Sequence, residues 1–131
     1  MDVERVGAEL SKNNLTLIAG TIFDDLVSES NFKNLQKQVD DICSFITKLP
    51  CAAREKGQNF PTPYLVIIDW GHNERDYDAG HPERALRLPN KDWDKMMAHI
   101  RSLADRAWEN YGVRSVIHPH AGGYIEFEDE I

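Results

Sequence analysis

The stretch Tyr64-Leu65-Val66-Ile67-Ile68-Asp69-Trp70-Gly71-His72 decides the fold class of this chain. Its uninterrupted apolar run is typical of a strand that is buried on both faces, as in a parallel sheet. The run leads directly into polar residues, and a glycine then interrupts it. We therefore expect a buried parallel strand whose carboxyl end carries candidate functional side chains.

Two further strands and three helices are predicted around this stretch. Apolar runs over residues 15–23 and 113–117 predict the other strands. Apolar residues at helical spacing predict a short helix over 3–10 and long amphipathic helices over 32–49 and 93–108. The order helix, strand, helix, strand, helix, strand favours right-handed crossovers between parallel strands. The predicted fold class is α/β, with one parallel sheet and helices packed outside it.

Two segments lie outside this regular pattern. The polar loop over residues 73–89 is long enough to suggest a function of its own. Residues 126–131 resemble the acidic first turn of a helix that has no body, and so short a helix would not be stable alone. Three parallel strands with open edges also make a poor independent domain. We therefore expect residues 1–131 to form a single partial domain of a larger α/β protein.

Composition narrows the function classes. The chain has 131 residues, 41% of them hydrophobic, and a net charge of −7. No cluster of Lys or Arg stands out, which argues against nucleic-acid binding. We expect no membrane span and no signal peptide at the start of the chain, and hence a cytoplasmic protein. Cys43 and Cys51 are expected to be reduced and structural.

The carboxyl ends of the three predicted strands carry the candidate site residues, because that edge holds the active site in parallel α/β folds. These residues are Gly20, Thr21, Asp69, Trp70, His72, His118 and His120. In the segment His118-Pro119-His120, side chains two residues apart on an extended backbone point the same way. Imidazole binds metals and titrates near neutral pH, so this pair indicates metal binding or proton transfer. His81 and His99 are expected on a loop and a helix surface.

The remaining strand-end residues have alternative roles. Asp69 would ligate a metal, orient a histidine or act as a base, or would simply cap the turn before Gly71. Trp70 offers a flat wall of the kind that packs against the C–H face of a sugar. His72 is either a substrate contact or an ordinary hydrogen-bonded histidine. Thr21 is grouped with them as a substrate-binding candidate.

The segments 117–126, Ile-His-Pro-His-Ala-Gly-Gly-Tyr-Ile-Glu, and 79–84, Ala-Gly-His-Pro-Glu-Arg, resemble the sugar phosphate isomerase/epimerase superfamily of xylose-isomerase-like TIM barrels. The resemblance is strongest to its inosose-dehydratase-type branch and covers only the middle of the (β/α)8 barrel. It implies a partial TIM barrel, truncated at both ends relative to the family, whose three strands correspond to the third to fifth.

The resemblance implies a metal-dependent isomerase, epimerase or dehydratase acting on a sugar or inositol-type polyol, with Mn, Mg, Co or Zn as the metal. Most metal ligands would lie outside this chain, which alone would be inactive. In many relatives a glutamate ligand stands where this chain has His118, which departs from that pattern, whereas the inosose-dehydratase-type branch also carries histidines there. His118 is retained as a candidate ligand, and His118, His120 and Asp69 are the catalytic candidates. Two alternatives remain open: a non-enzymatic half barrel that assembles through its strand edges, as a possible homo-oligomer, and a relative of abasic-site endonucleases.

Overall fold

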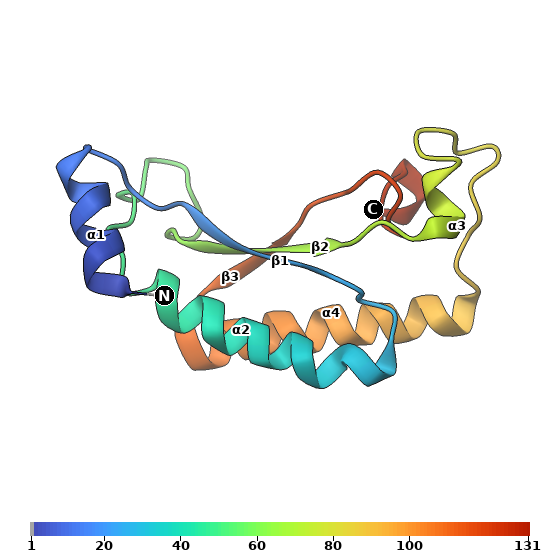
Figure 1. Ribbon diagram of the computed structural model, residues 1–131, viewed down its shortest axis with the longest axis horizontal. Coiled ribbons are helices and arrows are strands. Elements are labelled where there is room, and N and C mark those ends of the chain that lie inside the picture. Colours follow the sequence, from blue (N-terminus) through green and yellow to red (C-terminus); the bar gives the residue numbers. More distant parts are fainter. Residues whose placement is uncertain (1) are drawn as a thin grey trace.

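Three parallel strands form one open sheet in the computed structural model, which describes residues 2–131 (Figure 1). The strands are β1 (Ala19–Asp24), β2 (Tyr64–Asp69) and β3 (Arg114–Ile117), and their spatial order is β1-β2-β3. Thr21, Val66 and Val116 lie at the same level across the sheet. The predicted α/β class and parallel sheet are therefore confirmed, and the stretch that decides the fold is the central strand.

Two long helices cover one face of the sheet (Figure 1). They are α2 (Phe32–Ile46) and α4 (Asn90–Tyr111), and their buried residues pack against Ile22, Leu65 and Ile67 of the strands. The apolar side chains that α2 and α4 bury are Leu35, Val39, Cys43, Ile46, Met96, Ile100, Leu103 and Ala107. Gly112 ends α4 as predicted, in the left-handed conformation that glycine adopts without strain. This layer supplies the hydrophobic core.

Polar contacts tie the two helices to each other. Arg106 of α4 forms a two-pronged ion pair with Asp40 of α2, to which Tyr111 also donates a hydrogen bond of 3.0 Å. The Arg106 guanidinium holds the pKa of Asp40 below its usual value.

The prediction that His99 lies on the helix surface was wrong: its ring is buried, stacks on Phe32 and donates to the carbonyl of Leu26 at 2.9 Å.

The opposite face of the sheet has no helix over it in the described part of the chain (Figure 1). Phe23 on this face is 52% exposed, and Thr21 and Val116 are also exposed. In a sheet, alternate residues point to opposite faces, so this face carries the odd-numbered residues of β1 and the even-numbered residues of β2. This face therefore keeps apolar side chains exposed in the described part of the chain.

The first strand differs from its predicted bounds. The sequence predicted a strand over 15–23, but β1 begins at Ala19, and Leu15 and Ile18 are exposed. The reason is that this segment approaches the connector after α2 before it reaches the sheet: Leu17 pairs with Cys51 in an isolated bridge. At its other end the strand continues to Asp24, which lies beside Asp69 of β2.

Short helical elements occupy the remaining segments. α1 (Val3–Lys12) lies near the beginning of the strands, and η1 (Glu29–Asn31) leads into α2. The predicted loop over 73–89 begins with α3 (Asn73–Asp76), and the chain ends with η2 (Glu128–Glu130). Among residues 2–131, no helix is long and apolar enough to cross a membrane.

The acidic end of the chain is packed against the loop and is not a solvated helix start. The guanidinium of Arg75 is fully buried and donates to both carboxylate oxygens of Glu130, at 2.9 and 3.0 Å. Arg75 also donates to the carbonyl of Leu86 at 2.7 Å and lies over the rings of Tyr124 and Phe127. The ion pair therefore fastens the last residues to the loop after β2.

Candidate functional site

Asp69 is the centre of the candidate site, at the carboxyl end of β2. It is 2% exposed and points toward the helix layer, like Leu65 and Ile67. One oxygen accepts a hydrogen bond from the backbone N–H of Leu26, at 3.2 Å, and the other from the backbone N–H of Tyr124, at 2.8 Å. A single carboxylate thus joins the segment after β1 to the segment after β3.

His72 is the third partner of Asp69. Its Nε2 donates to Oδ2 of Asp69 at 3.0 Å, and its backbone N–H donates to the carbonyl of Gly122 at 2.9 Å. The ring packs against Tyr124, with the two centroids 4.6 Å apart, and Tyr124 donates its hydroxyl hydrogen bond to Glu74 at 2.7 Å. The imidazole is therefore held by both a carboxylate and an aromatic neighbour.

The surroundings of His72 favour its protonated form. Burial by itself lowers the pKa of this imidazole, but the hydrogen bond and the negative charge of Asp69, with the charges of Asp25 and Glu74, outweigh burial. The pKa of His72 is therefore raised above the usual 6.5. An aspartate–histidine pair of this kind stabilises a positive charge on the ring.

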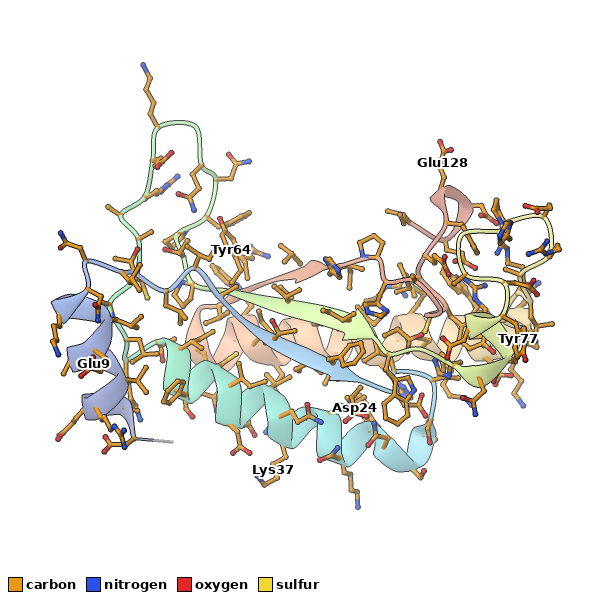
Figure 2. All side chains as sticks on the ribbon, turned by 45° about the horizontal axis from the view of Figure 1, so that its top comes forward. Glu9, Asp24, Lys37, Tyr64, Tyr77 and Glu128 are labelled. Atoms are coloured by element: carbon orange, nitrogen blue, oxygen red, sulfur yellow. The ribbon has the colours of Figure 1, made fainter. Side chains whose placement is uncertain are left out.

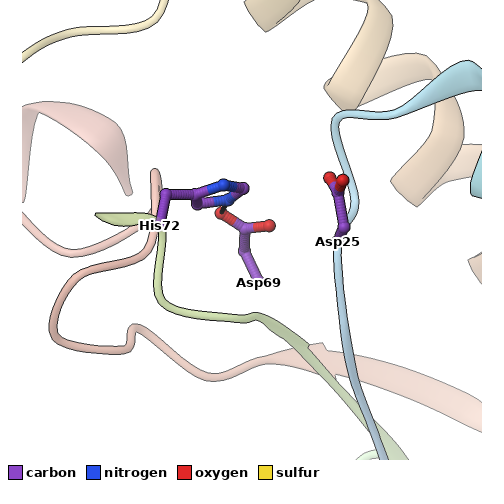
Figure 3. A group of neighbouring side chains, drawn as sticks. All are labelled: Asp25, Asp69 and His72. Atoms are coloured by element: carbon purple, nitrogen blue, oxygen red, sulfur yellow. Dashed lines mark hydrogen bonds and ion pairs between the residues drawn. The ribbon is translucent and has the colours of Figure 1, made fainter. Parts of the chain in front are cut away.

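Asp25 completes a group of three potential ligands (Figure 3). It directly follows β1, and its Oδ1 accepts backbone hydrogen bonds from Val27 at 2.8 Å and Ser28 at 3.0 Å, which fix the carboxylate in a tight turn. One ligand atom from each of Asp25, Asp69 and His72 lies within 4.8 Å of the others. Figure 3 shows the Asp25 carboxylate across from the His72 ring, with Asp69 below the ring.

The donor set of this group suits a divalent cation. Carboxylate and imidazole together bind Zn²⁺, Mn²⁺ and related metals, and a histidine ligand commonly donates its second ring nitrogen to a carboxylate. Since Asp69 accepts the hydrogen bond from Nε2 of His72, the His72 ring and the Asp25 carboxylate are the groups that would hold the metal. Asp69, whose oxygens both accept backbone hydrogen bonds, would orient His72.

Asp24, the residue before Asp25, is bound by amide side chains and does not belong to the Asp25–Asp69–His72 group. Asp24, which is labelled in Figure 2, accepts hydrogen bonds from Asn31 of η1 and from Asn34 and Gln38 of α2. Its charge is therefore directed toward the helix amides. Of the two consecutive aspartates that follow Phe23, only Asp25 belongs to the group of potential ligands.

His118 and His120 lie apart from the Asp25–Asp69–His72 group. Among residues 2–131, that group is the only one with three potential metal ligands in reach of one another, and it contains neither histidine. His118 is exposed, and its backbone N–H donates to the carbonyl of Ile67 at 3.1 Å, which extends the pairing of β3 with β2. The ring of His120 lies 5.0 Å from that of Phe23, on the open face.

The histidine pair nevertheless remains a polar feature of that open face. The two ring centroids are 6.4 Å apart. Nδ1 of His120 is buried and has no hydrogen-bond partner among the described residues. Buried polar atoms are usually paired, so this nitrogen is an exception in the described part of the chain.

Trp70 and Thr21 occupy different places. Trp70 lies at the site: its ring is partly exposed, stands edge-on to His72, and its backbone N–H donates to the carbonyl of Asp24 at 3.1 Å. Thr21 lies in the middle of β1, three residues before the strand ends, and is exposed on the open face. It therefore does not belong to the carboxyl edge where the sequence analysis placed it.

Sequence reasoning did not include Asp25 and Tyr124 in the site. Asp25 was missed because the predicted strand ended at residue 23, whereas β1 continues through Asp24. Tyr124 joins the site through its backbone N–H and its ring, which no sequence motif signals. In comparisons with known proteins, no protein-family model and no curated protein matches this chain.

Proposed function

We propose that the chain forms part of the active site of a metal-dependent isomerase, epimerase or dehydratase that acts on a sugar or inositol-type polyol. The observation that carries the proposal is the Asp25–Asp69–His72 group at the carboxyl ends of parallel strands. That edge is where parallel α/β enzymes hold their reactive groups. The sequence resemblance points to the same chemistry.

The partial (β/α)8 barrel belongs to this proposal. Helices cover one face of the sheet, and the other face carries the exposed side chains Thr21, Phe23 and Val116. In a closed barrel the helices lie outside, so this open face would become the interior. Further strands would pair with the free edges of β1 and β3 and supply the other walls of the pocket.

The chain's own residues would contribute to this chemistry from the carboxyl edge of the sheet. Asp25 and His72 would hold the metal, and Asp69 would fix the orientation of the His72 ring. A bound divalent metal would polarise a substrate carbonyl or hydroxyl group. His118 and His120 are the candidates for moving a proton at the carbon next to that carbonyl, because imidazole exchanges protons near neutral pH. Trp70 would provide an apolar wall for the substrate.

Isothermal titration calorimetry with Mn²⁺ and Zn²⁺ tests the metal site. We expect the unmodified chain to bind one ion, and we expect H72N and D25N to weaken binding by about tenfold or more, as loss of a ligand or its orienting group does. The control is H81N, since His81 lies exposed on the loop after β2 and faces Glu83. Equal affinity of H72N and H81N for both metals would remove the basis of the proposal.

Deuterium incorporation from D2O tests the proton transfer, because the proposed reaction would begin by removing a proton next to a carbonyl. The assay follows the C–H signals of ketoses and inososes by NMR with the metal-loaded full-length protein. Exchange should fall by about 100-fold in the double variant H118N/H120N, within the range that a general acid or base contributes. Unchanged exchange in that variant would exclude both histidines from the chemistry.

A further inference from the structure

The turn after β1 carries Asp25, one of the three potential metal ligands, and lies beyond the paired part of the sheet. β1 ends at Asp24, which is the last of its residues aligned with β2. The Asp25 carboxylate accepts hydrogen bonds from the backbone of Val27 and Ser28, which belong to the same turn. These bonds shape the turn but do not attach it to β2. The place of Asp25 beside the other ligands therefore depends on contacts from outside the turn.

Leu26 attaches the turn to two other elements. Its backbone N–H donates to Oδ1 of Asp69 in β2 at 3.2 Å, and its carbonyl accepts a hydrogen bond of 2.9 Å from Nδ1 of His99 in α4. A carbonyl oxygen is only an acceptor, so Nδ1 of His99 carries the proton. The Leu26 side chain is fully buried in the core. The residue next to Asp25 is thus held from two sides.

His99 is a polar residue on the apolar face of α4. It is 5% exposed and shares this buried face with Met96, Ile100 and Leu103. Burying the nitrogens of an imidazole is costly unless they are hydrogen-bonded, so an apolar side chain would be the ordinary choice at such a position. The bond from Nδ1 to the Leu26 carbonyl offsets that cost. The hydrogen bond is therefore what an imidazole provides here and an apolar side chain would not.

The segment after the turn fixes the orientation of the His99 ring. Phe32, the first residue of α2, stacks on the imidazole, with the centroids 4.4 Å apart and the planes 18° from parallel. On the other side of the ring, Nε2 lies 3.3 Å from the exposed carboxylate of Glu29 in η1. The ring is thus held by its face and at both nitrogens. Nδ1 is therefore kept directed at the carbonyl of Leu26.

We infer that His99 is a positioning residue of the Asp25–Asp69–His72 group: through the carbonyl of Leu26, it holds the turn that carries Asp25 against the end of β2. His99 acts on the group through the backbone of Leu26 and not by binding the metal. Its importance for metal binding rests on the proposed function, whereas the position of the turn can be measured without a metal.

Two amide variants of His99 form a matched pair that tests this inference. The side-chain nitrogen of asparagine lies as many bonds from Cβ as Nδ1 of histidine, and that of glutamine as many as Nε2. H99N can therefore still donate to Leu26, whereas H99Q keeps the donor that faces Glu29. Amide hydrogen exchange, followed by NMR in metal-free buffer, should be at least about tenfold faster at Leu26 in H99Q than in H99N, because the turn opens locally.

The backbone amide of Tyr124 is the internal control for global stability. It donates to the other oxygen of Asp69, outside the turn, so it should exchange at the same rate in H99Q and H99N. Calorimetry with Mn²⁺ then measures the effect on the site: H99Q should bind this ion about tenfold more weakly than H99N, as loss of a group that orients a ligand does. Circular dichroism checks that both variants fold, and H99L, which also lacks the donor, replaces H99Q if that variant does not.

The outcomes separate this inference from the proposed function. Equal exchange at Leu26 in the two variants, or exchange that rises equally at Leu26 and Tyr124, would overturn the inference. Equal affinity of H99Q and H99N for Mn²⁺, in a chain that binds this ion, would also overturn it. Faster exchange at Leu26 alone supports the inference even if the unmodified chain binds no Mn²⁺, a result that would contradict only the proposed function.

Discussion

Replacing Glu130 with glutamine should unfasten the end of the chain from the loop after β2. Glu130 is buried, and its two oxygens accept both prongs of the fully buried Arg75 guanidinium, at 2.9 and 3.0 Å. The variant E130Q keeps the size of the side chain and one acceptor oxygen but removes the negative charge. It therefore leaves a buried positive charge without its main partner.

The expected loss is about 3 kcal/mol of unfolding free energy, the lower end of the range for breaking a buried ion pair. We choose the lower end because Arg75 keeps two other contacts: the carbonyl of Leu86 at 2.7 Å and the Glu126 carboxylate at 3.6 Å. Single domains are stable by about 5–15 kcal/mol, so the variant should still fold. Urea unfolding followed by circular dichroism measures the difference.

Two further variants separate the buried charge from other effects. D129N removes an exposed carboxylate that pairs with Arg87, and its stability should stay close to that of the unmodified chain. R75M/E130Q removes both charges. Its loss of unfolding free energy should therefore be at least about 1 kcal/mol smaller than the sum of the losses in R75M and in E130Q. If E130Q and D129N have equal stability, the buried pair does not fasten the chain end.

Two other perturbations concern the site itself. In metal-free buffer the pKa of His72, followed by NMR, should lie above 6.5, and D25N should lower it because a neighbouring negative charge is lost. Since the folded-state pKa is raised, the stabilisation from protonated His72 is complete below pH 6.5 and is lost as pH rises through the folded-state pKa. A free energy of unfolding that does not change over this pH range would contradict the assignment. G123A should destabilise the fold by about 1–3 kcal/mol, because a Cβ there would lie 2.8 Å from the carbonyl oxygen of Asp69. G7A, on α1, should instead be neutral or stabilising, because a Cβ there would make only ordinary contacts of 3.8 Å with Leu49 and Pro50; equal urea midpoints for the two variants would refute the packing account.

The fold class could be predicted from the sequence because apolar runs and helical spacing are local signals. The residues of β2 were recognised correctly as a buried strand, and Gly112 as the end of α4. The start of β1 was not predicted correctly, because Leu15 and Ile18 are apolar but exposed. Composition alone cannot show that an apolar segment leads toward the sheet without joining it.

The site was predicted less completely because its geometry depends on which face each side chain occupies. An uninterrupted apolar strand conceals that alternation, so the sequence could place Asp69 at a strand end but not on the helix side. His120 contacts Phe23 on the opposite face. The pair Arg75 and Glu130 is separated by 55 residues, and no local pattern signals such a contact.

The position of Asp69 also decides which variants can test the proposed chemistry. Its carboxylate accepts hydrogen bonds from the segments after β1 and β3 as well as from His72, so it orders all three strand ends. Replacing Asp69 would leave buried backbone N–H groups unpaired, each at a cost of about 1–3 kcal/mol. Loss of activity in such a variant would not separate chemistry from folding. His72 and Asp25 contribute to the same group from its border, and they are therefore the residues at which the proposed metal binding can be tested while the fold is kept.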